Sequence, residues 1–161
     1  MKNKRLIREF QAFDNQSVFK LINLNNLSVK IEFKGPVDSP YENLNLSVNI
    51  LYHSAHPFRA PKIFFAPSIL HPNVNEYGEL IVGSLTGSEW SPALTTHQAM
   101  MTILSLLYEP FICDINLKKN DKGKEEETEE ANDECVNMEA LKLWRESSDS
   151  YREIVLLSYL E

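Results

Sequence analysis

The sequence predicts an α+β domain in which the strands come first and most of the helices follow. Between residues 18 and 65, short runs rich in β-branched and aromatic residues alternate with turn signals; after residue 95, apolar residues recur at helical spacing. Strands and helices segregated in this way pack as an antiparallel sheet with helices against one face and at its ends. The 161 residues fit one compact unit, so we expect a single domain over residues 1–161.

The first predicted element is an amphipathic helix over about residues 2–13. Leu6, Ile7 and Phe10 recur at helical spacing between charged side chains, which is typical of a helix with one buried stripe. We expect its outer face to be basic, formed by Lys2, Lys4, Arg5 and Arg8.

Four strands are predicted next, over residues 18–22, 27–33, 46–52 and Lys62–Phe65. The second and third runs alternate between apolar and polar residues, and turn pairs such as Asn25-Asn26 and Gly35-Pro36 separate the runs. This pattern predicts a four-stranded antiparallel meander with one solvated face.

Three helices are predicted after the strands. Residues 96–108 carry apolar side chains at helical spacing and stop before Pro110, which predicts a buried central helix. Two C-terminal helices follow over residues 136–146 and 148–160, the first with Met138, Leu141, Leu143 and Trp144 in its apolar pattern. Trp144, Tyr151 and Tyr159 are expected to be core residues.

The segment from 118 to 134 departs from the rest of the chain. It is dominated by Lys, Glu and Asp and has almost nothing apolar to bury. We therefore interpret it as a flexible acidic insertion on the surface.

Composition excludes several functions. Two cysteines, Cys113 and Cys135, are too few for a disulfide framework and lie in no zinc-ligand pattern, so we expect no metal and no cofactor. A formal charge of −7 argues against nucleic-acid binding, and no stretch is long and apolar enough to cross a membrane. A cytoplasmic or nuclear protein is expected.

Three motifs in the irregular stretch before the central helix carry a family resemblance. His71-Pro72-Asn73-Val74, then Gly78-Glu79-Leu80, then Trp90-Ser91-Pro92-Ala93-Leu94 follow one another in an order and spacing that resembles the active-site region of ubiquitin-conjugating enzymes. Turn motifs around the third strand, including His56-Pro57-Phe58, are similar as well. The resemblance implies that family's fold and the ubiquitin pathway.

The catalytic position departs from the family. In active members a cysteine eight residues after the motif asparagine takes the ubiquitin C-terminus as a thioester, and eight residues after Asn73 stands Ile81. An isoleucine side chain has no nucleophilic atom. His71, Pro72 and Asn73 then form a remnant motif, with Asn73 either an oxyanion donor left over from catalysis or a brace for its loop.

The resemblance also implies a partner surface. Phe58, Pro92 and Ala93 match the two loops with which conjugating enzymes meet RING-type ligases, and an exposed aromatic residue between prolines suits a binding hot spot. The alternative is that these residues only shape turns.

Three functions stay open at this stage. The favoured hypothesis is a non-catalytic variant that binds ubiquitin or a related modifier, an active conjugating enzyme or a ligase. It resembles the variants that help to build lysine-63-linked chains, although those commonly end soon after the central helix. The second hypothesis is an active transferase that uses a displaced thiol such as Cys113, which Asp114 would disfavour as a thiolate. The third is an adaptor on the same fold outside the ubiquitin pathway.

The insertion provides the first prediction. Deleting residues 118–134 should leave the melting temperature of the protein within a few degrees of the parent value. The segment has too few apolar groups to offset the entropy of ordering roughly seventeen residues at about 1–2 kcal/mol each. Thermal unfolding followed by circular dichroism measures this, and a fall of many degrees would mean that the segment packs on the domain.

Overall fold

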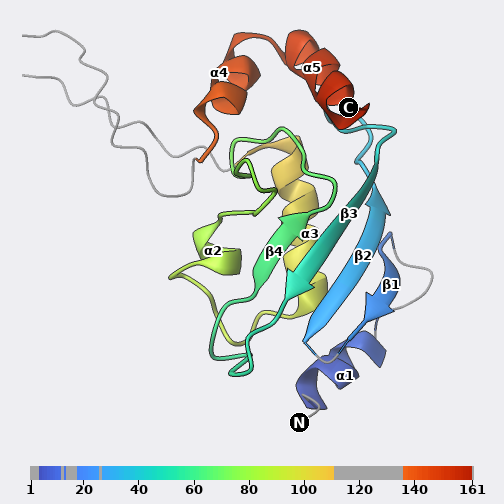
Figure 1. The fold of residues 1–161 in the computed structure, drawn as a ribbon, viewed down its shortest axis with the longest axis vertical. Helices are drawn as coiled ribbons and strands as arrows, with labels where there is room; N and C mark the ends of the chain where they lie inside the picture. Colours follow the sequence, from blue (N-terminus) through green and yellow to red (C-terminus); the bar gives the residue numbers. More distant parts are fainter. Residues whose placement is uncertain (1–3, 12, 14–17, 26, 111–135, 161) are drawn as a thin grey trace, which may run out of the picture.

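The computed structural model describes residues 4–11, 13, 18–25, 27–110 and 136–160, and it has the predicted α+β architecture (Figure 1). The four strands form one antiparallel sheet in the order β1-β2-β3-β4. Their bounds are β1 Lys20–Leu24, β2 Ser28–Lys34, β3 Asn45–Leu51 and β4 Lys62–Phe65. The described helices are α1 Lys4–Gln11, α2 Gly83–Thr86, α3 Thr96–Tyr108, α4 Met138–Glu146 and α5 Ser148–Leu160.

Most predicted elements agree with these bounds, and the differences have local causes. The bounds of β4, α3 and α5 match, whereas β1 begins and ends two residues later than predicted. The reason is a turn in which the Asn25 amide donates to the Ser28 carbonyl (2.8 Å), so that pairing with β2 continues as far as Leu24. Helix α2 was not predicted. The predicted insertion at 118–134 lies outside the described residues.

The core lies between the sheet and α3. Along β2 the residues Val29, Ile31 and Phe33 are buried, while the residues between them are partly exposed, as a sheet with one solvated face requires. Helix α3 crosses the inner face (Figure 1) and contributes buried Ala99, Met100, Ile103, Leu106 and Leu107. A capping box between Thr95 and Gln98 starts this helix.

An arm formed by residues 73–81 covers the outer edge of β4. The Leu80 amide donates to the Ile63 carbonyl and the Phe65 amide donates to the Gly78 carbonyl, both over 2.8 Å. Gly78 has a φ of +79°, and a Cβ there would stand 2.6 Å from the Phe65 carbonyl oxygen. The glycine of the Gly78-Glu79-Leu80 motif is therefore required by backbone geometry. The arm protects an edge that would otherwise be open to pairing.

The C-terminal helices pack at the end of the sheet opposite α1 (Figure 1). The phenol oxygens of Tyr41 and Tyr151 lie 2.9 Å apart, and both contact the Leu70 carbonyl oxygen, at 2.7 and 2.8 Å. Arg152 on α5 pairs with Glu42 over 2.6 Å. Tyr151 is fully buried, as predicted, whereas Trp144 and Tyr159 are only partly buried against the core.

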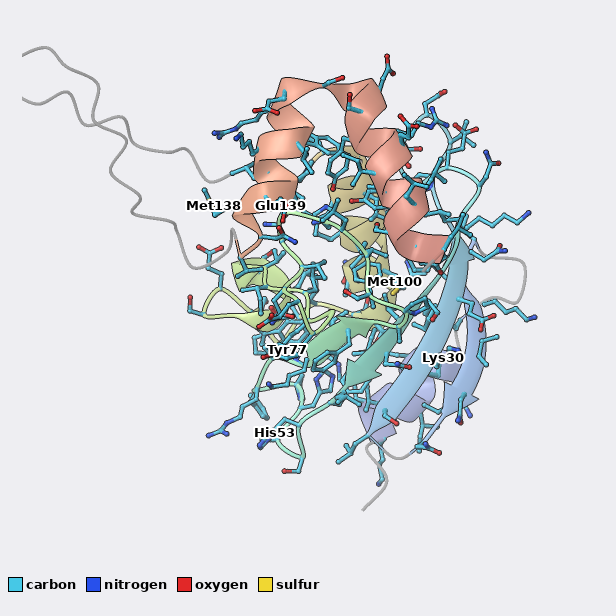
Figure 2. All side chains as sticks on the ribbon, turned by 45° about the horizontal axis from the view of Figure 1, so that its top comes forward. Lys30, His53, Tyr77, Met100, Met138 and Glu139 are labelled. Atoms are coloured by element: carbon cyan, nitrogen blue, oxygen red, sulfur yellow. The ribbon has the colours of Figure 1, made fainter. Side chains whose placement is uncertain are left out.

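Met138, the first residue in the apolar pattern predicted for α4, is exposed. Its side chain is 46% exposed and points away from the domain (Figure 2). The buried residues of α4 are Ala140 and Leu141. Just before the helix begins, the backbone amides of Val136 and Asn137 both donate to the Pro72 carbonyl at 3.1 Å.

Candidate functional site

The arm brings the predicted motif residues together. At its base the Ile81 amide donates to the Asn73 carbonyl (2.8 Å), and Val74 pairs with Leu80 one step further along. At its tip the Asn75 side chain accepts hydrogen bonds from the amides of Tyr77 and Glu79. Ile81 therefore lies directly beside Asn73, the asparagine of the His71-Pro72-Asn73 motif.

His71 joins this arm to the central helix. Its ring is 1% exposed, and Nδ1 accepts a hydrogen bond from the Asn73 amide at 3.0 Å. The other nitrogen, Nε2, lies 2.9 Å from the Leu106 carbonyl oxygen and must carry the proton, because that oxygen can only accept. Burial lowers the pKa of His71 to about 4, although the hydrogen bond to Leu106 opposes the shift. The ring is neutral at physiological pH.

Asn73 and Pro72 are also enclosed. Asn73 is 0% exposed, so its side-chain amide is not presented to solvent, and its backbone contacts both His71 and Ile81. Pro72 is buried, and its carbonyl receives the two amides that precede α4. In this arrangement all three motif residues connect parts of the scaffold.

Ile81 is partly exposed, between the buried side chains of Leu80 and Val82. The chain then turns into the four-residue helix α2, which is held by the Thr86 hydroxyl: it accepts from the Val82 amide (3.1 Å) and also contacts the carbonyl of Leu80. Cys113 and Cys135 lie outside the described residues.

The two loops of the predicted partner surface lie side by side. Phe58 is 80% exposed, and Pro92 and Ala93 are exposed as well. The Trp90 indole Nε1 donates to the Pro57 carbonyl at 2.7 Å and joins the loops. Beneath them the His56 ring is buried between Tyr52 and Trp90, with centroid distances of 4.7 and 5.9 Å.

One sequence interpretation of this region needs correction. Arg5 was predicted to share the basic outer face of the first helix with Lys4 and Arg8. Lys4 and Arg8 are exposed, but the Arg5 guanidinium is turned toward the carbonyls of Pro92 and Leu94. No local pattern indicated this contact, because it joins residues 87 and 89 positions apart.

Within the described ranges, no three His, Cys, Asp or Glu side chains are grouped closely enough to hold a metal ion. No helix in the part of the chain that the structure describes is long and apolar enough to cross a membrane.

A comparison with protein families shows which family the chain belongs to. A family model described as ubiquitin-conjugating enzyme matches residues 5–158, nearly the whole chain. The chain belongs to the ubiquitin-conjugating enzyme family. The match runs from α1 through most of α5 and includes the arm, the loop pair and the C-terminal helices. It assigns the protein to the ubiquitin-conjugation pathway.

The buried imidazole provides the second prediction. The pKa of His71 in the folded protein, about 4, lies below its ordinary value of 6.5, so the unfolded chain binds the proton first as the pH falls. The contribution of His71 to the free energy of unfolding is therefore fully present above pH 6.5 and is lost progressively as the pH falls to about 4. The loss should approach about 3 kcal/mol, at 1.36 kcal/mol for each unit of pKa difference.

Urea unfolding of the parent and His71→Gln between pH 7 and pH 4 measures this effect. The variant should be less stable at pH 7 and should show a shallower decline. His53→Gln, which removes an exposed histidine, should keep the parent profile. Equal slopes for the parent and His71→Gln would contradict the assignment.

Proposed function

We propose that this protein is a non-catalytic member of the ubiquitin-conjugating enzyme family that acts by binding. Its partner is ubiquitin or a related modifier, an active conjugating enzyme or a RING-type ligase. The observation that carries the proposal is the isoleucine at the nucleophile position in an otherwise complete family fold. Its place of action would be the cytoplasm or the nucleus.

The surroundings of Ile81 support this proposal. Thioester formation needs a thiolate that attacks the activated C-terminus of the modifier, and an aliphatic side chain cannot supply one. The Asn73 side chain, the candidate oxyanion donor, is enclosed, and His71 is a neutral brace between α3 and the arm. The adjoining side chains of Leu80 and Val82 are apolar.

The loop pair supports binding as the remaining activity. Phe58 projects from a loop whose position is fixed by the Trp90 hydrogen bond, so a partner would meet an aromatic anchor that is already ordered. Anchors of this kind, set in a defined surface, carry a large share of binding energy at interfaces. Pro92 and Ala93 extend the same exposed surface beside it.

The alternative is a transferase that uses a displaced thiol, Cys113. Such an enzyme would form a thioester with the modifier and then pass it to an amine, as active family members do. The two readings differ in one observable, a thiol-sensitive adduct.

Our third prediction is that no thioester forms. Mixed with activating enzyme, ubiquitin and ATP, the protein should show no band shift on a non-reducing gel, while an active conjugating enzyme treated in parallel should show one. An adduct that is removed by reducing agent and is lost in Cys113→Ala, but kept in Cys135→Ala, would establish the displaced nucleophile instead.

Our fourth prediction concerns the loop pair. Phe58→Ala should weaken partner capture by roughly thirtyfold, because truncating a true hot spot costs about 2 kcal/mol or more. The binding assay uses immobilised parent and variant against three defined sets of probes: ubiquitin, active conjugating enzymes and RING domains.

Tyr77→Ala is the matched control. Tyr77 is 77% exposed, close to the 80% of Phe58, but it lies at the tip of the arm (Figure 2). This variant should bind as the parent does, and thermal unfolding should show that both variants stay folded. If Phe58→Ala binds every probe as tightly as the parent, the loops only shape turns, and the outer face of α1 or of the sheet becomes the better candidate surface.

A further inference from the structure

Two hydrogen bonds tie the Arg5 side chain on α1 to the loop before α3, and another joins it to Glu9 on the same helix. The Arg5 Nη1 donates to the Pro92 carbonyl at 2.5 Å, and its Nη2 donates to the Leu94 carbonyl at 3.0 Å. Its Nε donates to the Glu9 carboxylate at 2.7 Å. The guanidinium thus holds two carbonyls of one loop from a helix nearly ninety residues earlier in the sequence.

Glu9 anchors the guanidinium to α3. One carboxylate oxygen accepts from Arg5, and the other accepts from both the amide and the hydroxyl of Thr96, each at 2.9 Å. Burial raises the pKa of Glu9, but the hydrogen bonds from Thr96 and Arg5 outweigh it and lower the pKa below 4.5. Glu9 is therefore ionised at neutral pH, and its bonds to Thr96 hold the Arg5 side chain in its orientation toward the loop.

The loop is held at its two ends, where Trp90 donates to the Pro57 carbonyl and Leu94 packs against the core. Pro92 and Ala93 have side chains that make no hydrogen bonds, and both are exposed. Ser91 supplies two contacts, but these lie within the loop: its hydroxyl accepts from the Ala93 amide and its carbonyl accepts from the Leu94 amide. The Pro92 and Leu94 carbonyls are the points at which Arg5 attaches this loop to α1.

The start of the loop is attached to the Phe58 loop. Trp90, which directly precedes Ser91, donates from its indole to the Pro57 carbonyl. Phe58 follows Pro57 directly. A shift of the loop that begins at Trp90 would therefore also move the backbone beside Phe58.

We propose that Arg5 is a positioning residue that sets Pro92 and Ala93 in place beside Phe58. Its effect on binding rests on the function proposed above, whereas its effect on the loop does not. Arg5 contributes through geometry, because a planar guanidinium presents several N–H groups in a fixed fork and can serve Glu9 and two carbonyls at once. A lysine in its place would keep the charge without the fork.

The test measures amide exchange by NMR in the full chain, for the parent, Arg5→Ala, Arg5→Lys and Lys4→Ala. We expect exchange of the Leu94 amide and of the Trp90 indole N–H to become about tenfold faster in both Arg5 variants, which corresponds to about 1.4 kcal/mol of local opening. Lys4→Ala, an exposed cation on the same helix, should match the parent. Exchange of the Ile31 amide in the centre of β2 should stay unchanged throughout.

Several results would overturn the proposal. Unchanged exchange at Leu94 in Arg5→Ala would show that the loop holds itself. If the Leu94 amide exchanged in Arg5→Lys as slowly as in the parent, a positive charge alone would be enough to hold the loop. Equal acceleration at Ile31 and Leu94 would show a loss of global stability in place of a local release.

A binding measurement separates this proposal from the previous one. With any probe that Phe58→Ala releases, Arg5→Ala should weaken binding by about tenfold, whereas the control variant Tyr77→Ala should bind as the parent does. If no probe depends on Phe58, the proposed function fails, but the exchange at Leu94 still decides whether Arg5 positions the loop.

Discussion

The fold around the site depends on the neutral ring of His71. It donates to the Leu106 carbonyl near the end of α3 and accepts from the Asn73 amide at the base of the arm, so one side chain joins the central helix to the segment that covers the edge of β4. Both bonds need one particular tautomer, and burial keeps the second proton off. This junction adjoins two further connections. The Asn73 carbonyl accepts from the Ile81 amide in the arm, and the Pro72 carbonyl accepts from the two amides that precede α4.

This arrangement separates the scaffold from the chemistry. His71, Pro72 and Asn73 are buried and bond to backbone groups, and Ile81 contributes its amide to the same arm. None of these bonds uses an atom of the side chain at position 81. The hydrogen bonds of the arm are therefore compatible with an aliphatic side chain at position 81.

The sequence predicted the elements whose extent depends on apolar periodicity and on turn residues. The α3 pattern ends at Pro110, and the alternation in β2 gives the solvated face directly. It did not predict α2, whose four residues, Gly83 to Thr86, are too short for any helical period and are held instead by the Thr86 hydroxyl. Apolar spacing grouped Met138 with Leu141, but Met138 is exposed and Leu141 is buried, because spacing alone does not show which part of a helix packs on the domain.

For the candidate site, the sequence located the loops but not what holds them. Phe58, Pro92 and Ala93 stand in recognisable local motifs, whereas Arg5 looks like one more cation on a solvated helix face. Arg5 bonds to backbone carbonyls, which every residue has. The residue types at positions 92 and 94 therefore give no indication that they accept hydrogen bonds from Arg5. Contacts between a side chain and a distant backbone leave no trace in composition or spacing. A contact such as that of Arg5 with the loop before α3 therefore becomes visible only when the chain is folded.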